Sequence, residues 1–320
     1  MKEELTKACT AKKTSIGGQA LIEGVMMRGP KRTAMAVRHT SGEIVTEEWE
    51  NDLSNKPTFW KLPFFRGMYN MVESMVFGYK CLMRSAELAG LEETPDKPAK
   101  KSEEILMSVM MVFSTVFGVV LALGLFMYLP SFLYKLLANF LDSYANVNFW
   151  SENAVVRGVF EGVLRLILFL GYLILVSLMK DIRRVFMYHG AEHKTIFCYE
   201  NGEELTVENV RKQSRFHPRC GTSFLVLMLL IGIIISICIR VDTVWLRVLI
   251  KIALLPITVG IGYELIKLAG RTTNTFTRII SAPGLWIQRL TTREPDDSMI
   301  ECAIAAFTPV VPEDPKADEW

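Results

Sequence analysis

Four stretches of the chain are apolar enough and long enough to cross a lipid bilayer as helices, which takes roughly 20 largely apolar residues each. These stretches are Ile105–Leu129, Val155–Met179, Thr222–Ile239 and Arg247–Leu268. The first carries no charge and is followed by Pro130, which we take as its end, and Pro256 is expected to kink the fourth. The pattern predicts a mainly α-helical polytopic membrane protein with about four transmembrane helices.

Lysine and arginine are divided unevenly between the loops that join these helices. The first loop carries Lys135 alone before Arg157 at the start of the second helix. The second loop is rich in basic residues: Lys180, Arg183, Arg184, Lys194, Arg211, Lys212, Arg215 and Arg219. Because short loops rich in Lys and Arg remain in the cytoplasm, we expect the N-terminus, the second loop and the C-terminus to be cytoplasmic.

The polar regions predict a small α+β cytoplasmic assembly. Thr33–His39 and Glu43–Glu50 flank Ser41-Gly42 as a hairpin. Gly17-Gly18 and the glycines that follow indicate close backbone packing. Phe64–Glu87 has an apolar and a charged side, as in a helix that either packs on the cytoplasmic assembly or lies in the membrane interface.

The C-terminal region predicts two more amphipathic helices. Phe276–Leu290 has an apolar stripe, and Thr292 with Glu294–Asp297 is typical of the start of a helix. The expected organisation is an N-terminal cytoplasmic region, a linker, a membrane domain with one cytoplasmic insertion, the C-terminal helices and a disordered tail. The boundaries are 1–90, 91–104, 105–270 with the insertion at 180–221, 271–308, and 309–320.

Three of the four histidines lie in the second loop, together with a cysteine. His189 and His193 are four residues apart, so on a helix both side chains project from one face. His217 and Cys220 follow with a two-residue gap between them. Three imidazoles and a thiolate form a ligand set that suits zinc or another divalent transition metal. The alternative is that the histidines are ordinary polar residues beside the membrane and bind no metal.

Glu192 gives the motif the form His-x-x-Glu-His, in which two histidines hold zinc and the glutamate acts as a general base. Hydrolysis requires one coordination position to stay open. If His217 and Cys220 both bind the ion, the site is closed and structural. The chain between the two halves is expected to contain a strand at Thr195–Glu200 and a short helix at Thr206–Gln213, folding over the site.

Charged residues within the second and fourth apolar stretches have two explanations. Arg157, Glu161 and Arg165 share one helix face, as do Arg247 and Lys251. They could line an ion or substrate pathway, as charges at membrane depth often do. Alternatively, the basic side chains reach the membrane surface along their apolar stems.

Composition narrows the class of protein further. A net charge of +2 argues against a nucleic-acid-binding protein. The cysteines have no framework spacing, which is typical of a reducing compartment. They are Cys9, Cys81, Cys198, Cys220, Cys238 and Cys302.

Four blocks together resemble the YqhQ family of bacterial membrane proteins. They are Gly17–Gly29, His189–Lys194, Phe216–Phe224 and Glu294–Asp297, within a resemblance running from about Ser15 to Phe307. The family is described as predicted metal-dependent enzymes of uncharacterised function. The resemblance implies a bacterial cytoplasmic membrane and supports a metal site at His189, His193, His217 and Cys220.

The first block has two interpretations. Gln19 and Glu23 either complete the site or hold the second nitrogen of a site histidine as outer partners of the metal, or they only cap and satisfy a packed glycine-rich turn. We expect the structural role.

These observations predict a membrane protein with a zinc-type site on its cytoplasmic face. The protein would be a metal-dependent hydrolase in which Glu192 is the general base. Its substrate would be a lipid or a cytoplasmic segment of a membrane protein. The alternatives are a non-enzymatic scaffold or assembly factor with a structural metal, and a small transporter that uses the charged faces. Four helices are few for a transporter unless the chain forms a homo-oligomer.

Overall fold

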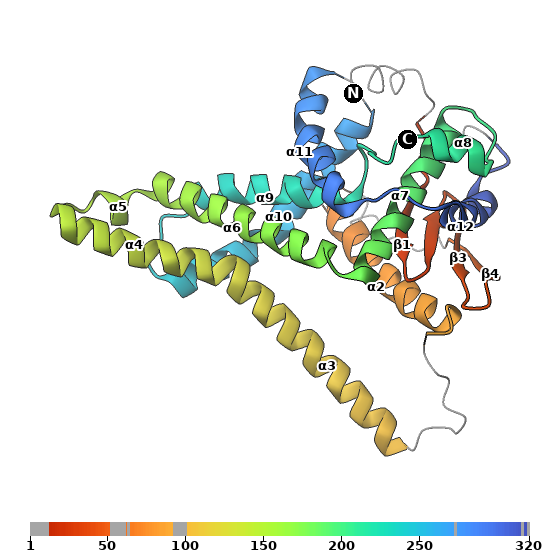
Figure 1. The fold of residues 1–320 in the computed structure, drawn as a ribbon. Helices are drawn as coiled ribbons and strands as arrows, with labels where there is room; N and C mark the ends of the chain where they lie inside the picture. Colours follow the sequence, from red (N-terminus) through yellow and green to blue (C-terminus); the bar gives the residue numbers. More distant parts are fainter. Residues whose placement is uncertain are drawn as a thin grey trace. The chain divides into compact units, whose positions relative to one another are not determined.

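The computed structural model describes residues 13–51, 62, 65–91, 101–271, 274–314 and 317–318. The chain divides into two compact units, whose elements are labelled in Figure 1. Unit 1 comprises Met1–Glu93, Ile174–Leu227 and Val259–Trp320, and unit 2 comprises Thr94–Leu173 and Met228–Thr258. Most of the predicted linker, residues 92–100, lies outside the described part of the chain.

Unit 1 is built on a four-stranded antiparallel sheet in sequential order. Its strands are β1 (Gly17–Leu21), β2 (Gly24–Arg28), β3 (Arg32–Arg38) and β4 (Ile44–Glu50). The predicted hairpin is confirmed, and Gly42 takes the left-handed backbone conformation (φ 91°) that its turn requires. The pair β1–β2 was not predicted from the sequence. Its two-residue loop places Glu23 in the left-handed region (φ 51°), where asparagine or glycine would have marked a turn.

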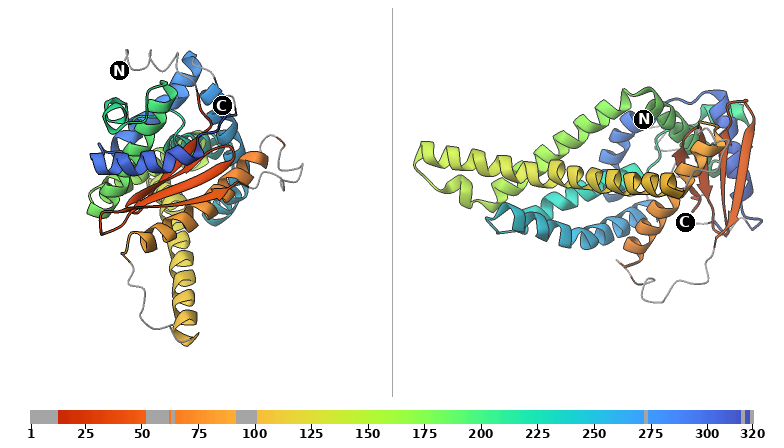
Figure 2. Two further views of the ribbon diagram at one scale, coloured as in Figure 1. Left: turned by 90° about the vertical axis from the view of Figure 1, so that its right-hand side faces the viewer. Right: turned by 90° about the horizontal axis from the view of Figure 1, so that it is seen from below.

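Side chains of the sheet alternate between two apolar cores because successive residues of a strand point to opposite faces. Val25 and Ala36 join one core, which contains the buried residues of α7 (Lys180–Glu200) and α12 (Asp297–Phe307). Met26 and Met35 join the other, with Cys81 of α2 (Phe65–Leu88). The left view of Figure 2 shows α12 in dark blue and α7 in green on one face of the sheet and α2 in orange on the other.

The predicted amphipathic helix is present as α2, and it packs on the sheet through small residues. Gly78 approaches Gln19 of β1 and Ala86 is buried, in keeping with the first of its two expected roles, whereas the buried Gly67 packs against Tyr263. The opposite side leaves large apolar side chains exposed, among them Val72 and Met75.

The second loop is more helical than the sequence indicated. Residues Thr195–Glu200 form the last turns of α7, so the predicted strand is wrong. Their β-branched and aromatic composition favours a strand, but burial of Ile196 and Cys198 in the unit 1 core outweighs that preference. The short helix α8 (Val207–Lys212) is confirmed and begins at the predicted Thr206, whose hydroxyl accepts from Asn209 N at 3.3 Å.

Four helical stretches in the described residues have the length and hydropathy to cross a membrane. They are Val109–Ala145, Ala154–Ser177, Gly221–Cys238 and Val244–Gly270. The first covers all but the first two turns of α3 (Lys101–Leu123), a π-helical turn η2 (Gly124–Tyr128) and α4 (Leu129–Ala145). The short α5 (Phe149–Glu152) follows it. The other three are α6 (Ala154–Ser177), α9 (Gly221–Cys238) and α10 (Val244–Arg271).

Pro130 does not end the first apolar helix, contrary to the prediction. It sits in the first turn of α4, directly after the π-helical turn. A proline has no N–H to donate to the carbonyl four residues earlier, which is that of Phe126. Arg165 of α6 supplies the missing donor, with its Nε 2.8 Å from Phe126 O. The helix therefore continues through the proline.

The C-terminal helices are confirmed as α11 (Thr275–Thr291) and α12, and Asp296 caps α12 through Met299 N at 2.9 Å. A 3-10 turn, η3 (Thr308–Val310), follows α12. The prediction of a disordered tail is wrong for its described residues. Val310 is buried in the unit 1 core, and Asp318 accepts from the Thr14 hydroxyl at 2.7 Å.

The burial of Met299 between the sheet and α12 predicts that one kind of substitution, Met→Ala, has different effects on stability at two positions. Met299 is fully buried there, whereas Met75 on α2 is 66% exposed. Met299→Ala should lower the free energy of unfolding by about 2–5 kcal/mol, and Met75→Ala should change it little. Thermal unfolding of the full chain in a mild detergent compares the two. Equal shifts would contradict the placement of Met299 in the core.

Candidate metal centre

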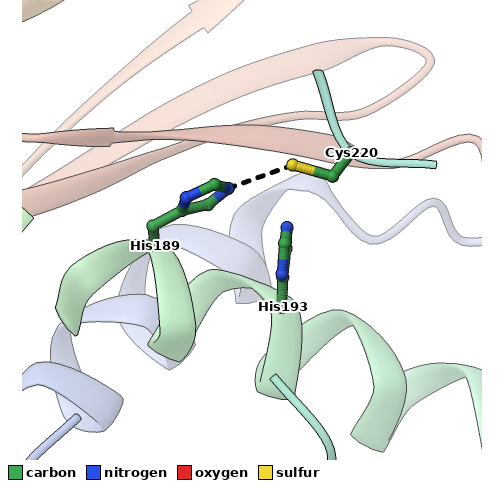
Figure 3. Close-up of side chains that lie close together, drawn as sticks. All are labelled: His189, His193 and Cys220. Carbon is green, nitrogen blue, oxygen red and sulfur yellow. Dashed lines mark hydrogen bonds between the residues drawn. The ribbon is translucent and has the colours of Figure 1, made fainter. Parts of the chain in front are cut away.

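Two imidazoles and a thiol meet at one point in unit 1. His189 and His193 lie one turn apart on α7, with ring centroids 4.4 Å apart. Cys220 lies directly before α9, and His189 Nε2 is 3.2 Å from its sulfur (Figure 3). One ligand atom from each of the three residues lies within 4.8 Å of the others. This set, His189, His193 and Cys220, is called the triad below.

Backbone carbonyls fix the orientation of both imidazoles. The Nδ1 atom of His189 is 2.9 Å from Thr291 O, and that of His193 is 2.6 Å from Arg215 O. A carbonyl oxygen only accepts, so each Nδ1 must carry the hydrogen and donate it. The Nε2 atoms of both rings then face the Cys220 sulfur. Metal-binding histidines use their second nitrogen in this way.

Two buried atoms at the triad have no hydrogen-bond partner within the described residues. They are His193 Nε2 and Glu192 Oε2. His193 is 1% exposed and Glu192 is 5% exposed, so both atoms are shielded from bulk solvent. Leaving buried polar atoms unpaired costs free energy, which a bound cation would recover at His193 Nε2. The residues present therefore fit a zinc-type ion.

The charges within the triad also favour a cation. Burial alone would favour a neutral His189 and a neutral Cys220 thiol. Cys220 nevertheless raises the pKa of His189 to about 9. The two histidines lower the pKa of the Cys220 thiol well below its usual value. These opposite shifts favour a thiolate at Cys220 beside a protonated His189, and thiolate is the form that binds metals.

Glu192 lies beside the triad without belonging to it. Burial raises the pKa of its carboxyl group, and the backbone N–H of Gly18 hydrogen-bonds to it. A side chain at Gly18 would meet the carboxylate carbon at 3.0 Å and Met26 O at 2.6 Å. The glycine thus allows strand β1 to approach α7 closely, as the glycine-rich block predicted. No sequence pattern pointed to Gly18 as a partner of Glu192.

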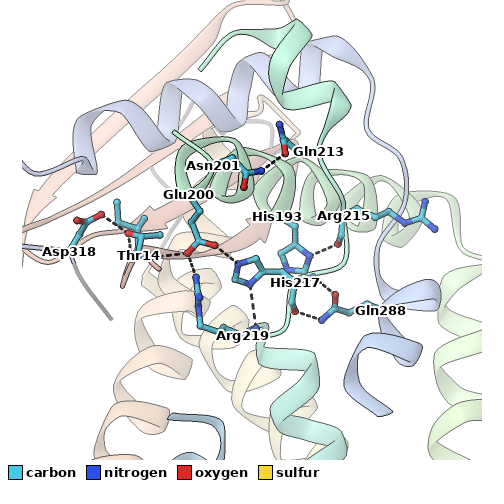
Figure 4. Close-up of polar contacts among 11 residues, drawn as sticks. Thr14, His193, Glu200, Asn201, Gln213, Arg215, His217, Arg219, Gln288 and Asp318 are labelled. Atoms are coloured by element: carbon cyan, nitrogen blue, oxygen red, sulfur yellow. Dashed lines mark hydrogen bonds and ion pairs between the residues drawn. The ribbon is translucent and has the colours of Figure 1, made fainter. Parts of the chain in front are cut away.

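The structure does not bring His217 into the triad. Its Nε2 is 3.6 Å from the Glu200 carboxylate, which also forms an ion pair with Arg219 (Figure 4). Its ring centroid is 5.5 Å from that of His193 and 4.7 Å from that of Phe197. Burial lowers the pKa of His217 to about 4, so its ring is neutral near pH 7. His217 borders the triad as a packed, neutral side chain.

Gln288 of α11 holds the backbone of the loop that carries His217 and Cys220. Its side-chain Oε1 accepts from His217 N at 2.7 Å, and its Nε2 donates to His217 O at 2.7 Å. The residue is fully buried. A polar residue within the apolar stripe of α11 was the one sign of this role in the sequence.

Gln19 and Glu23 lie away from both imidazoles. Glu23 accepts from Arg184 at 2.5 Å and from the Tyr188 hydroxyl at 3.3 Å. Gln19 packs against Gly78 of α2 and lines a cavity of about 340 Å³. In the described residues the second nitrogens of the histidines are held by carbonyls, whereas Glu23 fixes the β1–β2 turn to α7.

Comparison with known proteins places the chain in a family. A family model described as "Protein of unknown function (DUF1385)" matches residues 62–313, which include the triad and Glu192. The chain belongs to the DUF1385 family. It is 36% identical over 294 residues to "Uncharacterized protein YqhQ" of Bacillus subtilis (strain 168), covering 91% of this chain and 90% of that protein. This agreement confirms the resemblance seen in the sequence blocks. No solved structure matches the chain.

The neutral, buried His217 predicts how stability depends on pH in this DUF1385 member. Its pKa is about 4 in the folded protein, below the ordinary value of 6.5. Between these values the unfolded chain binds a proton that the folded chain does not, so stability should fall as the pH is lowered from 6.5 to 4. His217→Asn should flatten this part of the profile in thermal unfolding. His39→Asn, which removes the one histidine outside the triad and its surroundings, should leave the pH profile of stability unchanged.

Proposed function

We propose that this protein is a metal-dependent hydrolase of the bacterial cytoplasmic membrane that acts on a membrane-associated substrate. The observation that carries the proposal is the convergence of His189, His193 and Cys220 within 4.8 Å, beside a carboxylate with an unpaired oxygen. The sequence spacing of the two histidines supports it independently, because residues four apart on a helix share a face.

The ligand count favours catalysis over a purely structural ion. Structural zinc sites are closed by four protein ligands, whereas catalytic sites use three and keep a position open. The triad offers three, since His217 faces Glu200. A divalent ion held by the triad would act as a Lewis acid and lower the pKa of a coordinated water.

Glu192 is the proposed general base. It precedes His193 on α7, and its Oε2 has no hydrogen-bond partner in the described residues. Burial raises the pKa of its carboxyl group, so this group takes up a proton more readily than an exposed glutamate does. The N–H of Gly18 holds the carboxyl group in place.

The membrane assignment rests on the four apolar helices and the distribution of basic residues. The eight Lys and Arg residues of the second loop favour a cytoplasmic triad and cytoplasmic termini. The triad is close in sequence to α9, because Cys220 precedes it directly. A substrate held at the cytoplasmic surface, a lipid or a membrane protein segment, suits this location.

Burial of the triad favours a second candidate function. Cys220 is 8% exposed and His193 is 1% exposed. Structural metal sites are similarly enclosed, and such an ion would hold α7, α11 and the loop before α9 together in a non-enzymatic scaffold. The two functions differ in whether the ion accepts an external ligand.

Metal content tests the triad itself. Purified full-length protein should hold one zinc-type ion per chain, and His193→Ala and Cys220→Ser should each lower the content at least about tenfold, because a removed ligand leaves too few donors. His217→Ala and Glu192→Gln should retain the metal, since both lie outside the triad. Loss of metal in Glu192→Gln would make Glu192 a ligand and overturn its role as the base.

Cobalt substitution distinguishes the open site from the closed one. The visible spectrum of the Co²⁺ protein should show a thiolate charge-transfer band that Cys220→Ser removes. Added acetohydroxamate should shift the ligand-field bands of the wild type and of Glu192→Gln, because an open position takes up an external ligand. A spectrum that does not respond to acetohydroxamate would favour the structural ion and the scaffold.

A further inference from the structure

A second group of buried charged side chains lies in unit 2, apart from the triad. Arg157, Glu161 and Arg165 follow one another at four-residue spacing on α6, and Arg247 and Lys251 do so on α10. Each of the five is less than 9% exposed. These residues are called the charge cluster. Buried charges within apolar helices are costly and therefore mark functional positions by default.

One carboxylate serves three of the four cations. Lys251 Nζ forms an ion pair with Glu161, and Arg247 Nη1 lies 3.5 Å from Glu161 Oε1. Arg165 lies within electrostatic range of Lys251 and Glu161. Arg157 differs, because it donates to Ile239 O at 2.9 Å and pairs at 3.4 Å with the exposed Asp242.

The other acidic side chains in the described part of unit 2 leave most of the positive charge unbalanced. Asp242 attracts Arg247 as well as Arg157, but its side chain is 94% exposed, so solvent screens its charge. Asp142 accepts from the backbone N–H groups of Trp150 and Ser151 at 2.9 and 2.7 Å, so it caps that turn. Glu152 is exposed at the end of α5. The three cations that share Glu161 thus leave an excess of about two positive charges in a buried place, and burying unpaired charge costs several kcal/mol per ion.

Donors of the charge cluster are also left without acceptors. Within the described residues, Arg165 Nη2 and Arg247 Nε have no hydrogen-bond partner, and Arg247 Nη1 has only the ion-pair contact with Glu161 Oε1 at 3.5 Å. Arg165 is held in place by the bond from its Nε to Phe126 O, so its Nη2 is offered from a fixed guanidinium. Gly232 of α9 lies against this guanidinium, since a Cβ there would be in van der Waals contact with Arg165 Nη1 at 3.6 Å.

We infer that the charge cluster binds the phosphoryl group of an anionic ligand. A phosphoryl group brings several acceptor oxygens and one or two negative charges, which match the free donors and the excess charge. The donors come from α6 and α10, so a ligand with several oxygens can reach both where a single-atom anion cannot. The same chemistry is offered by a phospholipid headgroup and by free phosphate. This site is independent of the triad and of the proposed hydrolase activity.

Thermal unfolding of the full chain in a nonionic detergent tests the inference with defined probes. One arm compares sodium phosphate with sodium chloride at equal ionic strength. The other compares short-chain phosphatidylglycerol with short-chain phosphatidylcholine. Wild-type protein should be stabilised by phosphate, by phosphatidylglycerol or by both, and the arm that responds identifies the source. Arg247→Gln and Arg165→Gln should weaken the apparent affinity at least about tenfold, as expected for a lost charge-assisted hydrogen bond.

Lys135→Gln is the matched control, because it removes an exposed positive charge from α4 of the same unit. It should leave the response as in the wild type. Arg165→Lys keeps the positive charge, so it serves as the folded comparison if Arg165→Gln does not fold. Absence of any response in folded wild-type protein, or an equal loss in Lys135→Gln and Arg247→Gln, would overturn the inference.

Discussion

The orientation of two imidazole rings on α7 is the constraint on which the proposed chemistry depends. The carbonyl of Thr291, at the end of α11, fixes His189, and the carbonyl of Arg215 fixes His193. Cys220 approaches the same rings from the start of α9. Three segments that are far apart in the sequence thus meet at one turn of helix. Removing any one of them would free a ring or withdraw the sulfur, so the site exists only in the folded unit.

The two units bury charge in different ways. In unit 1 the buried Glu200 is matched by Arg219 and by backbone donation from Thr14, and His217 beside it stays neutral. In unit 2 one buried carboxylate faces more cations than it can neutralise. The first arrangement pairs its carboxylate with an arginine and a backbone N–H, and His217 Nε2 has no hydrogen-bond partner in the described residues. The second is satisfied only when an anion is added, and for this reason we assign a ligand to it.

Sequence patterns predicted the features that depend on local periodicity. The apolar helices, the β3–β4 hairpin and the shared face of His189 and His193 all follow from helix and strand spacing. The features that failed depend on partners distant in sequence. Pro130 continues a helix because Arg165 supplies a donor, and Thr195–Glu200 is helical because its apolar face enters the core. The β1–β2 hairpin was missed because its turn is stabilised by Glu23 and Arg184 rather than by a turn sequence. His217 was assigned to the metal because spacing cannot reveal Glu200 as its partner.

Zinc K-edge X-ray absorption of the purified full-length protein measures the central claim directly. The triad predicts one sulfur at about 2.3 Å and two imidazole nitrogens at about 2.0–2.1 Å, with one further oxygen or nitrogen that does not come from His217. The sulfur shell should disappear in Cys220→Ser. A bound ion with no sulfur neighbour, or with three imidazoles around it, would contradict the account.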